Sequence, residues 1–164
     1  MVFFVIANLG KKYFYRFITA YILGILVGGI IFLVFPTTIN IPAVTGNSFF
    51  DKLVKGIYAA DEPYNLFPSF HCFNTWIIFI GMREKKNLSW WYKSSFLIFS
   101  ILVFLATQFV KQHYFVDIIG GIALGEIAWW SIRFTKLPSF ADRIFTSLNH
   151  TLHLEKRPQK FTKK

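Results

Sequence analysis

LFPSFHCFNTWIIFIGM, residues 66–82, is a run of seventeen amino acids without a single Asp, Glu, Lys or Arg. Such a composition is typical of a helix that spans a membrane or lies fully buried. Yet Pro68, Ser69 and His71 stand together near its start. Burial alone does not require these three residues, so we expect the start of this segment to have a function.

Three further uncharged or nearly uncharged runs are Phe17–Phe35, Ser94–Val110 and Tyr114–Ile132. Hydrophobic residues make up 54% of the 164-residue chain, whereas about 45–50% is usual in soluble domains. As a helix, Phe17–Phe35 would cover about 28 Å, close to the thickness of a hydrocarbon core. Met1–Leu9 is apolar but too short to span, like the end of a helix whose beginning is absent. The sequence predicts an all-α polytopic membrane helix bundle with about four full spans plus a partial N-terminal helix.

The basic residues are distributed unequally between the two sides of this predicted bundle. Fifteen Lys and Arg residues fall on one side, and only Lys52, Lys55 and Lys111 on the other. The richer side should be cytoplasmic, with a membrane domain over residues 1–136 and a basic cytoplasmic tail over 137–164. The net charge of +10 is then explained by topology, so membrane lipids are the predicted partners and nucleic acid is not.

The predicted outer side carries a long loop, Pro36–Asn65. Within it, FFDKLVKGIY (residues 49–58) is predicted to be an amphipathic helix in the membrane interface. On the apolar helices, the glycine pairs Gly24/Gly28 and Gly121/Gly125 fit close helix packing. Cys72 is the only cysteine, so it forms no intrachain disulfide, and we expect it to fill space between helices.

Two polar clusters enter the predicted spans from the outer side: Pro68–His71 and His113–Asp117. His113 and Asp117 are four residues apart and would share a helix face. Asp117 would then accept a hydrogen bond from one imidazole nitrogen of His113 and make the other nitrogen a nucleophile. A protonated His71 across the helix interface would protonate a departing alkoxide. Ser69 would donate to a phosphate oxygen.

Other interpretations of these residues remain open at this point. A histidine or aspartate near a helix end is often only a polar group at headgroup level. Metal binding by the two histidines and Asp117 is a weaker alternative, because structural zinc usually has four protein ligands. We therefore predict no metal and no cofactor. Glu126, inside the last span, is given no role.

The clusters resemble motifs of the type 2 phosphatidic acid phosphatase superfamily. Pro68-Ser69-Phe70-His71 is similar to its Pro-Ser-x-His motif, and His113-x3-Asp117 to the core of its Ser-Arg-x5-His-x3-Asp motif. The variant is most similar to the branch that includes inositol-phosphorylceramide synthases. The resemblance covers roughly Lys11–Ile132 and implies an N-terminally truncated member of a family of six-helix membrane bundles.

The resemblance also implies an activity and roles for individual residues. The protein would be an integral membrane lipid-phosphate phosphatase or phosphotransferase with its site near the outer surface. His113 would take up the phosphoryl group, Asp117 would orient His113, and His71 would be the general acid. Ser69 would help to hold the phosphate. Phosphatidate, phosphatidylglycerol phosphate, polyprenyl pyrophosphate and a ceramide acceptor are all compatible with the motifs.

The chain departs from the family pattern where phosphate is bound by cations. The family's Lys-x6-Arg-Pro motif has no counterpart here, and its Ser-Arg pair falls on Ala106-Thr107. Thr107 and Lys111 are the candidate substrate-binding residues in their place. The alternative is a degenerate, non-catalytic membrane protein that keeps the family fold.

Overall fold

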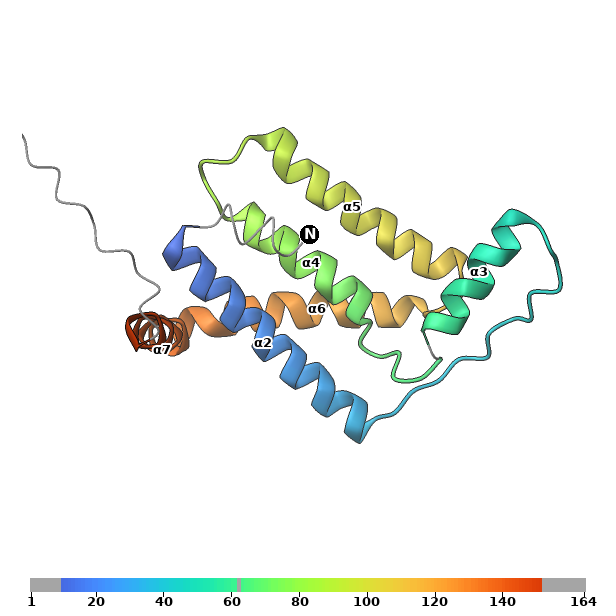
Figure 1. Cartoon of the computed structure of the whole chain (residues 1–164), viewed down its shortest axis with the longest axis horizontal. Coiled ribbons are helices and arrows are strands. Elements are labelled where there is room, and N and C mark those ends of the chain that lie inside the picture. Colours follow the sequence, from blue (N-terminus) through green and yellow to red (C-terminus); the bar gives the residue numbers. More distant parts are fainter. Residues whose placement is uncertain (1–9, 62, 152–164) are drawn as a thin grey trace, which may run out of the picture.

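The computed structural model describes residues 10–61 and 63–151, which form a bundle of helices (Figure 1). The elements are α2 (Lys11–Val34), α3 (Phe49–Ala60), α4 (Phe70–Arg83), α5 (Trp90–Phe109), α6 (Phe115–Ser131), the short 3-10 helix η1 (Ile132–Phe134) and α7 (Leu137–Thr151). This part of the chain contains no strand, only an isolated bridge between Thr38 and Tyr64. The predicted all-α class is confirmed. The predicted N-terminal partial helix lies outside the described residues.

Among the described residues, three helices are long and apolar enough to cross a membrane: Tyr13–Val34, Trp90–Phe109 and Phe115–Phe134. They correspond to three of the four predicted spans. The remaining predicted span, Leu66–Met82, overlaps α4, which has 14 residues and would measure about 21 Å. The helix begins only at Phe70 because Ser69 is its N-cap and accepts a hydrogen bond from the backbone N–H of Cys72.

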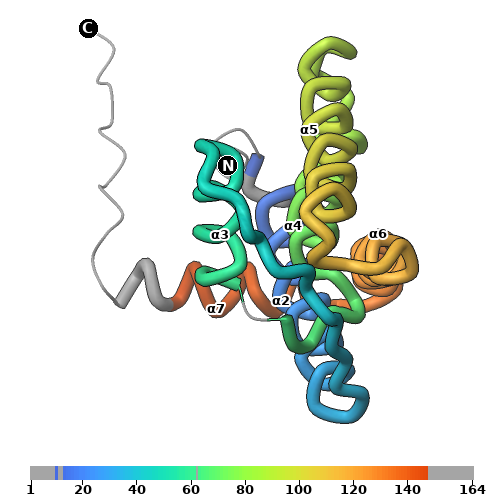
Figure 2. Tube along the Cα trace, turned by 90° about the vertical axis from the view of Figure 1, so that its right-hand side faces the viewer, coloured from blue at the N-terminus to red at the C-terminus, as the bar shows by residue number. Residues whose placement is uncertain are grey.

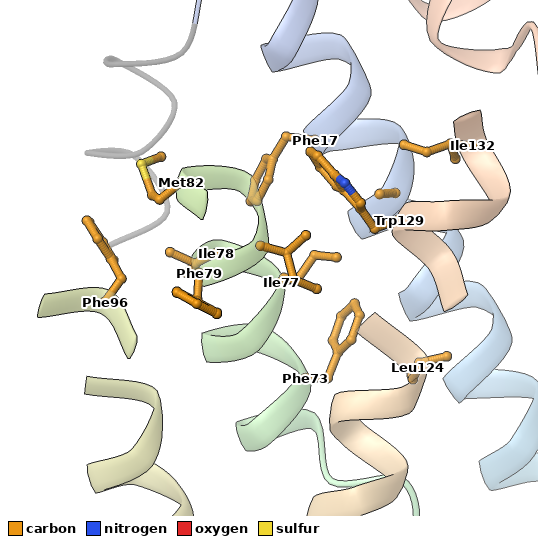
Figure 3. Close-up of a cluster of buried hydrophobic side chains, with 12 residues drawn as sticks. Phe17, Phe73, Ile77, Ile78, Phe79, Met82, Phe96, Leu124, Trp129 and Ile132 are labelled. Atoms are coloured by element: carbon orange, nitrogen blue, oxygen red, sulfur yellow. The ribbon is translucent and has the colours of Figure 1, made fainter. Parts of the chain in front are cut away.

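The short helix α4 lies at the centre of the bundle, packed against α2, α5 and α6. Figure 3 shows the resulting core, in which side chains of α4 such as Phe73 and Ile77 lie between Phe17 of α2 and Leu124 of α6. Phe73 and Ile77 have no exposed surface. By contrast, α2 and α5 expose many large apolar side chains, as helices in contact with lipid would.

The approach to α4 is fixed by the loop that precedes it. The hydroxyl of Thr37 accepts hydrogen bonds from the backbone N–H groups of Leu66 (2.9 Å) and Phe67 (3.0 Å). The carbonyl of Thr37 accepts a third bond, from Asn65 (2.7 Å). One residue just after α2 therefore holds the chain that leads into α4.

On α2, phenylalanine rings of α4 occupy the space beside Gly24 and Gly28, the pair of glycines predicted to allow close packing. A Cβ atom at Gly24 would lie 2.3 Å from the ring of Phe73, and one at Gly28 would lie 2.3 Å from the ring of Phe70. The prediction of close packing at these glycines is confirmed. We call Gly24 and Gly28 the glycine notches of α2.

Gly121 on α6 meets backbone rather than a ring. A Cβ atom there would lie 2.5 Å from the carbonyl oxygen of Ser69 and 3.0 Å from the backbone nitrogen of Phe73. Backbone cannot rotate away as a side chain can, so α4 and α6 can approach this closely only with glycine at this position.

We expect Gly121→Ala to lower the free energy of unfolding by about 1–3 kcal/mol, because the added methyl group forces the two helices apart. The matched control is Gly29→Ala on α2, where an added Cβ meets nothing within 4 Å. Thermal unfolding of both variants in the same detergent checks this. Equal melting temperatures for Gly121→Ala and the control would contradict it.

Two ion pairs lie at the end of the bundle opposite α3, where α4 ends. The guanidinium of Arg83 donates to both carboxylate oxygens of Glu126 (2.9 and 3.1 Å). Arg16 donates to Glu84 (2.9 Å) and lies 4.4 Å above the ring of Trp129. Glu126, which received no role from sequence, is therefore paired with a neighbouring helix.

Helices α3 and α7 lie at opposite ends of the bundle (Figure 1), and Figure 2 shows both set apart from the axes of α4 and α5. The helix predicted over residues 49–58 is confirmed as α3, although its place in a membrane interface stays a prediction. Ser48 and Asp51 close its first turn with reciprocal hydrogen bonds. Helix α7 occupies residues that the sequence assigned to a basic tail, and it exposes Phe140 and Ile144.

Candidate active site

The predicted catalytic residues lie at or just before the starts of helices α4 and α6, which meet beside α3. His71 lies in the first turn of α4, His113 precedes α6 by two residues, and Asp117 lies in the first turn of α6. The backbone N–H of Ser69 donates to the carbonyl of Asp117 (3.0 Å), which ties the start of α4 to the start of α6. The close approach at Gly121 makes this bond possible.

His113 and Asp117 are neighbours within the protein interior. Nδ1 of His113 lies 3.4 Å from Oδ2 of Asp117, and both residues are buried. The contact is at ion-pair distance but is not a formed hydrogen bond, since Nδ1 has no hydrogen-bond partner among the described residues. Oδ2 of Asp117 instead accepts from the backbone N–H of Tyr114 (2.8 Å).

The two residues meet by a different route from the one expected. Because α6 begins at Phe115, His113 is not on the same helix as Asp117, and the expected shared helix face is wrong. The chain turns into the helix at Tyr114, and this turn brings the imidazole over the carboxylate. Spacing of four residues therefore gave the right neighbours for a different geometric reason.

Two glutamines fix the turn that carries His113. The side-chain amide of Gln108 donates to the carbonyl of His113 (3.0 Å). The backbone N–H of Gln112 donates to the carbonyl of Thr107 (3.0 Å). Two residues at the end of α5, Thr107 and Gln108, thus fix the backbone of Gln112 and of His113.

His71 lies on the open side of this arrangement. Its ring centroid is 5.7 Å from that of His113, at an interplanar angle of 64°. About half of its side chain is exposed, at 49%, in contrast to His113. Nε2 of His71 lies 3.8 Å from Oδ2 of Asp61, which also accepts a hydrogen bond from the side-chain amide of Gln112 (3.1 Å).

The environment of His113 favours the neutral imidazole. Burial lowers the pKa of His113 below its ordinary value, the carboxylate of Asp117 opposes this shift, and the neighbouring His71 adds to it. A neutral imidazole retains the lone pair that a nucleophile needs. The two histidines therefore differ in their surroundings, one buried beside a carboxylate and one open to solvent.

The residues predicted to bind substrate are not brought together in the same way. Ser69 has no exposed surface and uses its hydroxyl to cap α4. Thr107 is buried, and its hydroxyl donates to the carbonyl of Phe104 (2.8 Å). Lys111 is exposed on the turn before His113, in the left-handed region with φ 55°.

In the described part of the chain, none of the hydrogen bonds and ion pairs of the two histidines and Asp117 involves a lysine or arginine. Lys55 donates instead to the carbonyl of Gly46 (2.8 Å). Among residues 10–61 and 63–151, no group of three or more His, Cys, Asp or Glu side chains could hold a metal ion.

A cavity of about 380 Å³ reaches Asp117 from the side of α2. Apart from Asp117, its lining consists of Phe35, Thr37, Thr38, Leu66, Phe67, Tyr114 and Val116. Most of these side chains are apolar or aromatic, so the cavity has the character of a pocket for hydrocarbon beside a polar group.

Asp61, Gln108 and Gln112 were not identified from the sequence. Gln108 gave a signal, because it is an amide near the end of an otherwise apolar run, whereas Gln112 follows Lys111 outside that run. Asp61 gave none, since it lies in a long loop whose path depends on tertiary contacts. The hydroxyl of Tyr58 donates to the carbonyl of Val110 (2.7 Å), and this bond places the end of α3 beside the site.

The fold and its three apolar helices define a polytopic helical membrane protein. The chain belongs to the PAP2 superfamily, because the model of that family matches residues 1–131. The resemblance to type 2 phosphatidic acid phosphatases is thereby confirmed at the level of the superfamily, and the protein is a membrane protein of the phosphatase type. No curated protein and no solved structure matches the chain.

Proposed function

We propose that this protein is a lipid-phosphate phosphatase or phosphotransferase that works through a phosphohistidine at His113. The observation that carries the proposal is the buried pair of His113 and Asp117, with the more exposed ring of His71 5.7 Å away. The apolar cavity that reaches Asp117 supports a lipid substrate, since it offers a place for hydrocarbon beside the carboxylate that contacts His113.

In the proposed mechanism, a nitrogen of His113 attacks phosphorus and the bond from phosphorus to the leaving oxygen breaks. Asp117 stabilises the positive charge that develops on the imidazole. His71 gives its proton to the leaving oxygen, and the resulting neutral His71 then takes a proton from water or another hydroxyl. That oxygen attacks the phosphohistidine and releases His113.

The proposed topology follows the distribution of basic residues. The end of the bundle that carries α7 faces the cytoplasm, and the end that carries α3, His71 and His113 faces outward. The membrane domain is proposed to cover residues 1–136, and residues 137–164 form the cytoplasmic end of the chain. Membrane lipids are the proposed partners, and no cofactor takes part.

A non-catalytic family member is the second candidate. It is favoured by one observation: in the described residues, no lysine or arginine pairs with the candidate site. The experiment that separates the two candidates measures phosphate release from lipid phosphates and traps labelled phosphohistidine in the purified chain. A folded protein that does neither would leave only the non-catalytic function.

We expect His71→Ala to slow the reaction in proportion to how poor the leaving group is. General acid catalysis contributes about 10²–10⁴-fold for an alkoxide, whereas p-nitrophenolate departs with little need of a proton. Turnover should therefore fall by about 100-fold or more with an alkyl phosphate and by less than about tenfold with a p-nitrophenyl ester. Equal losses on both substrates, in enzyme of unchanged melting temperature, would remove His71 as the acid.

A further inference from the structure

The site has a second carboxylate besides the buried Asp117. This carboxylate belongs to Asp61 and lies on the solvent-exposed side of the two imidazoles. Its Oδ2 lies 3.8 Å from Nε2 of His71 and accepts a hydrogen bond from Gln112. Its charge also acts on His113, where it opposes the effect of burial on the pKa. Asp117 and His113 are buried, whereas Asp61 and His71 are about half exposed. A ligand oxygen bound at Nε2 of His71 would therefore lie close to the carboxylate of Asp61.

The carboxylate of Asp61 occupies the place beside His71 where the proposed mechanism requires an oxygen of the substrate. In the proposed mechanism, His71 gives its proton to the oxygen of the leaving group. In the structure, the group that faces Nε2 of His71 is the carboxylate of Asp61. A bound phosphate ester would have to share this space with a negative charge, or displace it.

In the described residues, no hydrogen bond or ion pair of Asp61 involves a lysine or arginine. A protonated His71, which the proposed mechanism requires, balances the charge of Asp61 but leaves no net positive charge on this pair for a ligand. The carboxylate of Asp61 has His71 and Gln112 as its partners, and an amide is neutral. On α3 itself, Lys55 is bound to the carbonyl of Gly46, and Lys52 is exposed. The carboxylate of Asp61 therefore repels each additional negative charge on a ligand bound beside His71.

Building on the proposed function, we propose that Asp61 selects the substrate by its charge. It favours a phosphodiester, which carries one negative charge, over a phosphomonoester, which carries close to two above pH 7. The preferred substrate is then a lipid whose phosphate is esterified on both sides. The reaction is the transfer or hydrolysis of one of those two ester bonds.

The test compares two small ligands that differ in charge, dimethyl phosphate and methyl phosphate, at pH 8. Their dissociation constants from the full-length protein in a neutral detergent are measured by phosphorus NMR titration. We expect the native protein to bind dimethyl phosphate about tenfold more tightly, corresponding to about 1.4 kcal/mol. Asp61→Asn should remove this preference, because asparagine keeps the size and the acceptor for Gln112 without the charge.

The matched control is Asp51→Asn, which removes a carboxylate from the first turn of the same helix. It should keep the tenfold preference. Ligand size affects all three proteins alike, so the change in the ratio isolates charge. The proposal is overturned if Asp61→Asn keeps the preference of the native protein, or if the native protein has none or binds neither ligand.

A kinetic arm separates this proposal from the proposed function. The ligands are p-nitrophenyl phosphate and methyl p-nitrophenyl phosphate, which share a leaving group, and Asp61→Asn should shift the kcat/KM ratio about tenfold toward the monoester. If neither ester is turned over and no phosphohistidine forms, the proposed catalytic function fails. The binding ratio still decides the role of Asp61 in that case.

Discussion

Phosphohistidine is expected to disappear completely in His113→Gly, and turnover to fall by at least about 10⁴-fold. The physical reason is that the proposed reaction has no other nucleophile: His71 is held at the open side, facing Asp61, and lacks a buried carboxylate beside it. Loss of a covalent nucleophile typically leaves only the catalysis due to binding and electrostatic stabilisation. The measurement is label incorporation from a labelled lipid phosphate, together with steady-state turnover.

For His113→Gly, rescue by added imidazole distinguishes the loss of a nucleophile from the loss of a purely structural residue. Removal of the buried imidazole leaves a space beside Asp117, and added imidazole can enter it and act as the nucleophile. Partial recovery of turnover by imidazole, but not by an apolar molecule of similar size, is the expected result. Label that persists on the His113→Gly protein would place the covalent intermediate on another residue and contradict the prediction.

Asp117→Asn is expected to lower turnover by roughly 100- to 1,000-fold, or about 3–4 kcal/mol. Asparagine can still accept the hydrogen bond from the N–H of Tyr114, so the start of α6 is preserved. What is lost is the charge 3.4 Å from Nδ1 of His113. In serine proteases, the corresponding change from aspartate to asparagine lowers turnover about ten-thousand-fold. We expect less here, because the half-exposed His71 admits water to the site.

The Michaelis constant should change little in Asp117→Asn, since the carboxylate acts on His113 and does not hold the phosphate. Asp51→Asn serves again as the matched control and should leave both constants unchanged. Turnover of Asp117→Asn within about threefold of the native value would show that His113 and Asp117 do not act as a catalytic pair.

The bundle was predictable from sequence because its signal is local. Uncharged runs of the right length identified α2, α5 and α6, and the same signal located α4. The ends of the helices were less predictable. Helix α2 starts at Lys11 rather than Phe17, because the prediction followed the uncharged run, whereas lysine and arginine are good helix formers and do not end a helix. Helix α4 starts four residues after the start of the apolar run, because the capping residue Ser69 sets its first turn.

The candidate site was only partly predictable, because its parts are recruited in different ways. His113 and Asp117 are close in sequence, so any compact turn would bring them together. His71 was placed by topology, since alternating spans put two helix starts at the same end. Asp61 depends on the hydrogen bond from Tyr58 to Val110, a contact between distant parts of the chain that has no periodic pattern in the sequence.

The glycine notches of α2 have a consequence for how the protein is assembled during synthesis. Helix α2 is synthesised before Phe70 and Phe73, so its notches would contact lipid chains until α4 packs against them. When α4 arrives, aromatic rings replace these lipid chains, and apolar surface is exchanged for apolar surface. Shape complementarity, rather than escape from water, must then drive the docking. The membrane therefore acts as a temporary partner that occupies the place of α4 until that helix is made.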